Sequence, residues 1–264
     1  MIHTRRFGTS DGVPTLLAHC FLGSSKGWEP LVEALAPRLD AEAFDMPGHG
    51  RSPMPDHVED LHELVTHQID GLVTKPSLLI GHSFGGASAL RFALHNPDRV
   101  LGLALIEPVF IAAALADPNF KAAATEGDYA TLAREGRLEE AARDFFTYND
   151  PTRDWFALPE PARAKMTAQM QLLPATEPGA VSDSGNLLAP GLMEGFTRPV
   201  LLIGGERSPP MFAAIINALA KRLPNVETAI IDGAGHMAPM THPQQTADLI
   251  SAWMSAKGLG VRQG

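Results

Sequence analysis

Residues 77–86 read SLLIGHSFGG, a short apolar run that leads into a serine flanked by glycines. The run is typical of a buried strand, and the residues after it have the spacing of a helix. A serine whose hydroxyl must stand clear of a sheet needs a sharp turn from strand to helix, and Gly81 and Gly85 would allow that turn around Ser83. The segment therefore predicts a nucleophilic serine, against the alternative of a glycine-rich turn that only packs or caps the helix.

The same alternation of strand and helix continues on both sides of this segment. Further apolar runs that indicate buried strands lie at 15–21, 41–46, 99–107, 199–204 and 227–232. Helical patterns separate them, at 28–39, 57–73, 85–96, 210–223 and 243–256. Strands that alternate with helices form βαβ units, so the sequence predicts an α/β fold with a mainly parallel sheet.

One long segment interrupts this rhythm. Residues 110–196 contain no convincing strand, are rich in Ala, Glu and Arg, and carry several prolines. We expect a helical cap there, inserted into an α/β core formed by 1–109 and 197–264. Its aromatic and methionine side chains either line an apolar pocket or belong to the core. They are Phe145, Phe146, Tyr148, Trp155, Phe156, Met166 and Met170.

Composition excludes several classes of protein. The chain has 264 residues, 45% of them apolar and 19% charged, as in ordinary globular enzymes. The net charge of −9, without clusters of Lys and Arg, argues against a nucleic-acid partner. No apolar run approaches the roughly 20 residues that cross a bilayer, so no membrane association is expected.

Cysteine usage and motifs bear on location and cofactors. Cys20 is the single cysteine and cannot form an internal disulfide, and the N-terminal residues lack the apolar stretch of a secretion signal. We therefore expect a cytoplasmic protein. The metal motifs H-E-x-x-H and C-x-x-C and the phosphate-binding loop are missing from the sequence, so we expect neither a metal nor a cofactor.

Four motifs in chain order resemble the α/β-hydrolase superfamily. GHSFGG (81–86) resembles its nucleophile turn, LLAHCFLGSS (16–25) its oxyanion loop, DMPGHGRS (45–52) the strand and turn that follow, and GAGHMAP (233–239) its histidine loop. The resemblance implies an eight-stranded, mainly parallel sheet flanked by helices, with a cap after the sixth strand, and a serine-dependent, esterase-like activity.

The resemblance also implies an oxyanion hole formed by the backbone N–H groups of Phe21 and Phe84. The sequence departs from the family at Cys20, which stands where a glycine is usual. A side chain there narrows the allowed backbone angles, which puts the Phe21 assignment in question. We expect Cys20 to be a small buried hydrophobe rather than a nucleophile, and His19 to be a structural hydrogen-bonding residue of the loop.

His236 is the candidate general base among ten histidines. It follows an expected strand and a glycine turn, so its ring would lie at the sheet edge from which Ser83 also emerges. A general base must come within about 2.6–3.2 Å of the serine oxygen. A purely structural loop histidine is the alternative. The histidines at 57, 62, 67 and 95 are expected to be solvated.

The imidazole needs a carboxylate that fixes its tautomer. The family usually carries this acid in a loop that resembles G-E-x-D, but here Ser208 occupies the Asp position. Glu107, at the end of the strand next to the one that bears Ser83, is the preferred acid. Glu206 is the alternative, and we expect it to point elsewhere, pairing with Arg207. Both keep the chain order Ser, acid, His.

These residues predict two-step hydrolysis of a small carboxylic ester or thioester through an acyl-enzyme, with a small-molecule acyl substrate. The same residues would also suit a C–C bond hydrolase, a lactonase, a perhydrolase or a hydroxynitrile lyase. A ligand-binding member of the fold without turnover is a third possibility, supported by the replaced Asp. The sequence does not distinguish a monomer from a homodimer.

Overall fold

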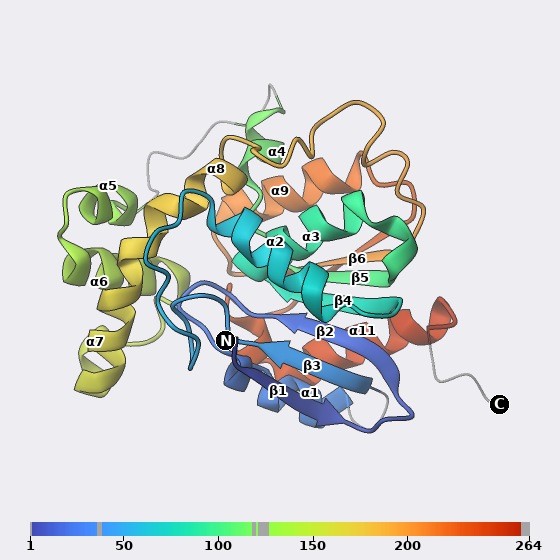
Figure 1. Cartoon of the computed structure of the whole chain (residues 1–264), viewed down its shortest axis with the longest axis horizontal. Coiled ribbons are helices and arrows are strands. Elements are labelled where there is room, and N and C mark those ends of the chain that lie inside the picture. Colours follow the sequence, from blue (N-terminus) through green and yellow to red (C-terminus); the bar gives the residue numbers. More distant parts are fainter. Residues whose placement is uncertain (1, 36–38, 118–119, 121–126, 260–264) are drawn as a thin grey trace.

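A seven-stranded sheet forms the centre of the molecule in the computed structural model, which describes residues 2–35, 39–117, 120 and 127–259. The strand order is β1-β3-β2-β4-β5-β6-β7, and every pair is parallel except β1 with β3 (Figure 1). The strands are β1 Thr4–Gly8, β2 Val13–Ala18, β3 Leu39–Phe44, β4 Ser77–His82, β5 Val100–Ile106, β6 Val200–Gly205 and β7 Val226–Ile231.

The predicted α/β class and the mainly parallel sheet are confirmed, but the strand number differs. Eight strands came from the family resemblance alone, whereas the described residues form seven. Six of them match apolar runs of the sequence within three residues. The seventh, β1, has alternating exposed and half-buried residues because it is an antiparallel edge strand, which explains why no buried run marks it.

Two layers of helices cover the sheet (Figure 1). The helices α1 Glu29–Leu35 and α11 Pro243–Ala256 pack on one face, where Leu31 and Trp253 share a core with Ile80 of β4. The helices α2 Leu61–Leu72, α3 Phe84–His95 and α9 Pro210–Ala220 pack on the other face. All six residues of β4 are buried, as expected for a strand between two helical layers.

The segment between β5 and β6 is helical, and its described residues contain no strand. Its helices α5, α6 and α7 lie to one side of the sheet, whereas α4 and α8 lie closer to α2, α3 and α9 (Figure 1). The division of the chain into a core and a cap stays a prediction. The helices are α4 Ile111–Leu115, α5 Tyr129–Arg134, α6 Leu138–Asn149, α7 Glu160–Gln169 and α8 Glu177–Ala180.

Short helices complete the described fold. The helix α10 Ala238–Thr241 follows the histidine loop, and four 3₁₀ turns join longer elements. These are η1 Ser25–Trp28, η2 Pro97–Arg99, η3 Trp155–Ala157 and η4 Met170–Thr176.

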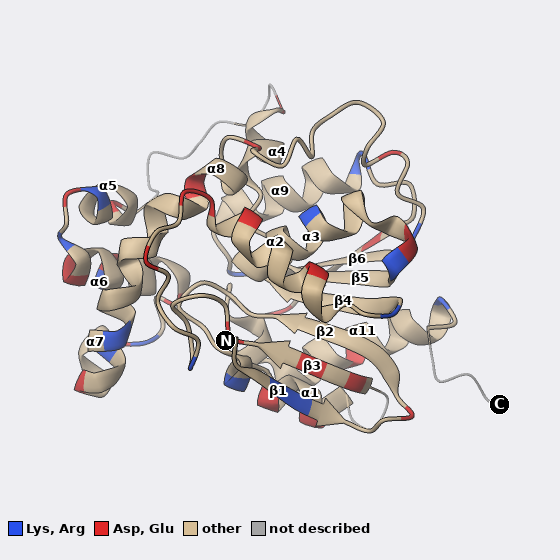
Figure 2. Ribbon diagram, viewed as in Figure 1, with Lys and Arg blue, Asp and Glu red and all other residues tan. Residues whose placement is uncertain are grey.

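Surface charge is of mixed sign. Figure 2 shows basic and acidic residues side by side along α5 and α6, where Arg137 pairs with Glu135 and Glu140. Within the described part of the chain, none of the helices has the length and apolar character needed to traverse a lipid bilayer.

Candidate active site

Ser83 occupies a strained turn between β4 and α3. Its backbone has φ 56° and ψ −121°, a combination that residues other than glycine rarely adopt. Such a conformation costs on the order of 1–3 kcal/mol and persists only where neighbouring contacts hold it. The Ser83 N–H donates to the Ile106 carbonyl at 2.9 Å, and the Ser83 carbonyl accepts from Val109 N–H at 3.1 Å. The turn is thereby attached to the end of β5.

The flanking glycines are required by close packing. A Cβ on Gly81 would lie 2.6 Å from the Cα of Gly86, and one on Gly85 would lie 2.3 Å from the carbonyl oxygen of Ala18. Neither position has room for a side chain, so α3 can begin directly against β2 and β4. The prediction that these glycines permit the turn is confirmed.

The structure brings Ser83, His236 and Glu107 together at the carboxyl edge of the sheet. His236 Nε2 lies 2.9 Å from Ser83 Oγ, and His236 Nδ1 lies 2.7 Å from Glu107 Oε2. The three residues are 4%, 3% and 1% exposed, respectively. An ionised carboxylate only accepts hydrogen bonds, so Nδ1 carries the proton and the Nε2 lone pair faces the serine hydroxyl. This is the arrangement that a general base for serine requires.

The imidazole of His236 is held on both sides. The ring of Phe212, from α9, stacks on it with 4.2 Å between the ring centres and a 17° tilt. The ring of His82 lies with its centre 4.9 Å from that of His236, and its Nε2 donates to the backbone carbonyl oxygen of His236 at 2.8 Å. Burial lowers the pKa of His82 well below its usual value, so this ring is a neutral donor. These contacts limit rotation of His236 away from Ser83.

Glu107 directly follows β5 and has a φ of 43°, which turns its side chain across the ends of the strands. One carboxylate oxygen meets His236, and the other, Oε1, accepts from the backbone N–H of Gly205 at 2.7 Å. The second contact comes from the end of β6, where the family usually places its acid loop. Both carboxylate oxygens therefore have donors, and the orientation of the carboxylate is fixed.

Glu206, the alternative acid, points away from the imidazole. Its Oε2 accepts from the backbone N–H of Gly233 at 2.8 Å and so joins the loop after β6 to the turn after β7. This contact replaces the pairing with Arg207 that the sequence suggested. Ser208, at the family's Asp position, has a buried hydroxyl without a hydrogen-bond partner among the described residues.

The candidate oxyanion donors lie on two segments that meet at this edge. Phe84 is the first residue of α3, so its N–H has no partner within the helix. Phe21 lies in the loop after β2, and its N–H forms no hydrogen bond with the described residues. The two rings pack with their centres 6.3 Å apart. Leu22 follows with a φ of 62°, which gives the loop a sharp bend despite the missing glycine.

The loop that carries Phe21 is fixed by a neutral histidine. His19 Nδ1–H donates to the Cys20 carbonyl at 2.7 Å, and its Nε2 accepts from Met46 N–H at 3.1 Å. Burial lowers the pKa of His19 to about 4. Burial also raises the pKa of the Cys20 thiol to about 12, so this thiol stays protonated and is a poor nucleophile. The structural interpretations of His19 and Cys20 are both confirmed.

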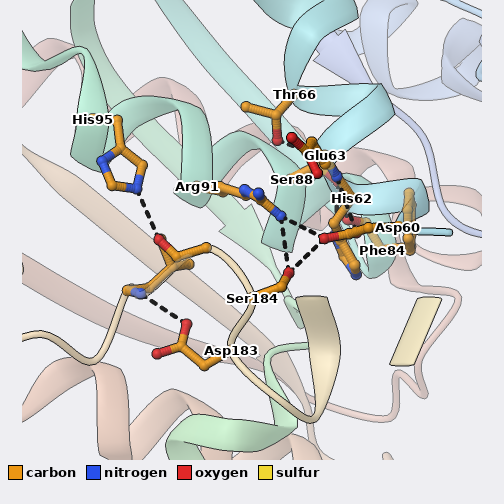
Figure 3. A network of polar contacts seen from close by, with 12 residues as sticks. Asp60, His62, Glu63, Thr66, Phe84, Ser88, Arg91, His95, Asp183 and Ser184 are labelled. Carbon is orange, nitrogen blue, oxygen red and sulfur yellow. Dashed lines mark hydrogen bonds and ion pairs between the residues drawn. The ribbon is translucent and has the colours of Figure 1, made fainter. Parts of the chain in front are cut away.

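The expectation that His62 is solvated is wrong. His62 is 2% exposed, its ring stacks on Phe84 with centres 4.0 Å apart, and its Nδ1 lies 2.9 Å from Ser88 Oγ (Figure 3). Burial lowers its pKa to about 3. The signal was present, because His62 shares the buried face of α2 with Val65 and Ile69 at helical spacing. The other three histidines are exposed, as expected.

A polar network connects the segment that follows α8 to α2 and α3 (Figure 3). Arg91 of α3 lies 3.0 Å from Asp60 Oδ2 and 3.2 Å from Ser184 Oγ. Asp60 also accepts from Ser184 Oγ, and its other oxygen caps α2 at Glu63 N–H. Side chains of α2, α3 and the segment around 184 are thereby joined in one cluster.

Ser83 opens into a mainly apolar cavity of about 250 Å³. The cavity lies between the turn at Ser83 and the helical segment 110–196. Its charged lining residues are Arg134 and Glu177, which form an ion pair. The other lining residues are Phe21, Phe84, Val109, Ile111, Tyr129, Ala130, Phe145, Leu173, Thr176, Ala180 and Val181. Of the aromatic and methionine residues singled out in the sequence, Phe145 lines this cavity, whereas Trp155 and Met170 belong to the core.

Metal-binding geometry is not found in the described residues, where no group of three or more His, Cys, Asp or Glu side chains is arranged to hold an ion.

A sequence model of the alpha/beta hydrolase family matches residues 15–249. The chain belongs to this family. The match includes every motif from which the resemblance was drawn.

Relatives of the chain include several esterases and a lipase. The chain is 27% identical to Lipase LipV of Mycobacterium tuberculosis, with 94% of this chain and 96% of the relative covered. It is 28% identical to the pimeloyl-[acyl-carrier protein] methyl ester esterase of Aeromonas hydrophila subsp. hydrophila, with 94% and 97% covered. The carboxylesterase CesB from Bacillus subtilis matches with a TM-score of 0.70 at 20% identity over 97% of this chain and 88% of its own. That structural likeness concerns the fold alone.

Proposed function

We propose that the chain is a serine hydrolase that cleaves a small carboxylic ester or thioester through an acyl-enzyme. The observation that carries the proposal is the unbroken line of hydrogen bonds from Ser83 through His236 to Glu107, at the wall of an apolar cavity. In this proposal Ser83 attacks the acyl carbon while His236 Nε2 removes its proton. His236 then protonates the leaving alcohol or thiol, and water releases the acyl group by the same route in reverse.

Glu107 and the two phenylalanine N–H groups have supporting roles. The carboxylate of Glu107 stabilises the imidazolium that forms when His236 takes the serine proton. The N–H groups of Phe84 and Phe21 would bind the oxyanion, and the N-terminal end of α3 adds a positive dipole at the same place. The strained backbone of Ser83 holds its Oγ clear of β4.

The names of the relatives support an ester as substrate. The matched chains include a lipase and methyl ester esterases, and the matched structures include carboxylesterases. Haloalkane dehalogenases also share the fold, but the nucleophile position here holds a serine, which favours acyl transfer over the chemistry of a carboxylate nucleophile.

We further propose that 110–196 acts as the cap over the active site. Its residues supply most of the cavity wall opposite Ser83, which supports this division. A cytoplasmic location is proposed from the cysteine content, because Cys20 is buried and unpaired. Whether the active form is a monomer or a homodimer stays open.

The test is hydrolysis of p-nitrophenyl esters with two to eight acyl carbons by the wild type and by Ser83→Ala. We expect turnover by the wild type and a loss of at least about a thousandfold in kcat for the variant. Ser208→Ala is the matched control, because its hydroxyl is also buried but has no hydrogen-bond partner among the described residues and does not line the cavity. Its kcat should stay within about threefold of the wild type. Failure of the wild type to hydrolyse any ester would favour a ligand-binding role or one of the other reactions of this triad.

A further inference from the structure

Two cavities meet at a pair of phenylalanine rings near the site. The larger, of about 250 Å³, is lined by Ser83 and Phe84. The smaller, of about 100 Å³, is lined by Cys20, Met237 and Met240, among others. Phe21 and Phe145 line both cavities, and their rings meet edge to face with centres 5.7 Å apart. These rings are therefore the wall that separates the two spaces.

The partition is held from both sides. Phe145 lies on α6, where the ring of Tyr129 packs edge-on against it at 5.1 Å. Asn149, one turn later, donates to the Phe145 carbonyl at 2.8 Å. Phe21 packs edge-on against His49 at 5.2 Å between centres. Each ring is supported by its own segment, so the wall does not depend on one element alone.

The chemistry of acyl transfer gives the two cavities different occupants. In the acyl-enzyme the acyl carbon is bonded to Ser83 Oγ, so the acyl chain extends into the cavity that Ser83 lines. The departing alcohol oxygen must take its proton from His236 Nε2. Met237, the next residue after His236, lines the smaller cavity, so this is the space that we assign to the alcohol portion.

We propose that Phe145 is a specificity-determining residue that separates an acyl compartment from a smaller alcohol compartment. The substrate class that fits is an ester of an apolar acyl chain with a small alcohol, because the two volumes differ by more than a factor of two. This inference rests on the proposed ester hydrolysis and adds which part of the ester each cavity takes.

Two series of esters separate the compartments. The acyl series consists of methyl esters of straight-chain acids with four to ten carbons, and the alcohol series consists of butyrate esters of methanol to hexanol, both followed by proton release. Ala130, on α5, lines the larger cavity, and Met166, on α7, lines the smaller. Ala130→Phe and Met166→Trp would each reduce one space, and Phe145→Ala would remove one of the two rings between them.

Each variant has its own expected pattern in kcat/KM. Ala130→Phe should lower the kcat/KM ratio of decanoate to butyrate methyl ester about tenfold and leave the ratios of the alcohol series within about threefold. Met166→Trp should lower the ratio of hexyl to methyl butyrate about tenfold and leave the ratios of the acyl series within about threefold. Phe145→Ala should raise the ratio of hexyl to methyl butyrate about tenfold. Thr147→Ala, on the exposed face of the same helix, is the control and should leave both series unchanged.

The outcomes separate this inference from the proposed function. Two results would overturn the assignment of compartments while ester hydrolysis stands. The first is normal ester turnover by Phe145→Ala with the ratio of hexyl to methyl butyrate unchanged. The second is an exchange of effects, in which Ala130→Phe changes the alcohol series and Met166→Trp the acyl series. If the wild type cleaves no ester in either series, the proposed function fails, and the compartments fail with it.

Discussion

Replacing Glu107 by Gln tests the orientation of the imidazole without changing the size of the side chain. The carboxylate has two fixed contacts, from His236 Nδ1 at 2.7 Å and from Gly205 N–H at 2.7 Å. Both partners donate in the wild type. An amide has one accepting oxygen and one donating nitrogen, so Gln cannot satisfy both partners.

Either orientation of the amide is unfavourable. If its oxygen keeps the Gly205 contact, its NH₂ group faces Nδ1 and favours the tautomer with the proton on Nε2, which cannot accept the serine proton. If its oxygen faces His236, the NH₂ group opposes the Gly205 N–H in a site that is 1% exposed. The comparable Asp to Asn change in a serine protease triad costs about 10⁴ in kcat. We expect a loss of that order, or about 5 kcal/mol in transition-state stabilisation.

The assay is the steady-state kcat on p-nitrophenyl butyrate, with thermal unfolding as a check that the variant is folded. Glu206→Gln is the matched control, because it removes the same charge one strand away and its carboxylate meets only the Gly233 N–H among the described residues. Its kcat should stay within about threefold of the wild type. A Glu107→Gln enzyme that keeps a tenth of the wild-type kcat, or a Glu206→Gln enzyme that loses as much, would refute the assignment.

Three further predictions concern stability. Gly85→Ala should lower the free energy of unfolding by about 3 kcal/mol in urea titrations, because its Cβ would lie 2.3 Å from the Ala18 carbonyl oxygen. Gly71→Ala, which has open space around it in α2, should raise this free energy by up to about 1 kcal/mol. Equal effects of the two variants would contradict the packing argument. Arg91→Met should cost about 2 kcal/mol, because it leaves the mostly buried Asp60 carboxylate without its cation, and an unchanged urea midpoint would count against it. The free energy of unfolding should also fall from pH 7.5 to pH 5, because three buried histidines have pKa values lowered from 6.5 to between about 3 and 4 and therefore protonate first in the unfolded chain. Each of them contributes up to about 2 kcal/mol to this decrease. Equal stability at the two pH values would be evidence against neutral rings. The histidines are His19, His49 and His62.

Much of the fold could be predicted because its signals are local. The buried strands of a parallel sheet form continuous apolar runs, and β4 and β5 were found from such runs within a residue of their bounds. Edge strand β1 has no such run, since one side of it faces solvent. The strand number taken from the resemblance is one too high for the described residues, because it did not come from the runs of this sequence.

The contacts of the site depend on the order of strands, which the sequence does not state. Glu107 and Glu206 each directly follow a strand of the same parallel sheet, β5 and β6, and the choice between them depends on side-chain direction. The structure gives Glu107 the contact with His236 and turns Glu206 toward Gly233. The division of the cavity was equally hidden, because Phe21 and Phe145 lie far apart in the chain and meet only in the folded molecule.

The most direct test of a nucleophilic Ser83 is covalent labelling with a fluorophosphonate, followed by mass spectrometry of the intact chain and of its tryptic peptides. We expect one adduct per chain, located on Ser83, and a labelling rate that falls at least about a hundredfold in His236→Ala because the general base is lost. An unlabelled wild-type chain, or an adduct on another residue such as Cys20, would contradict the assignment of Ser83 as the nucleophile.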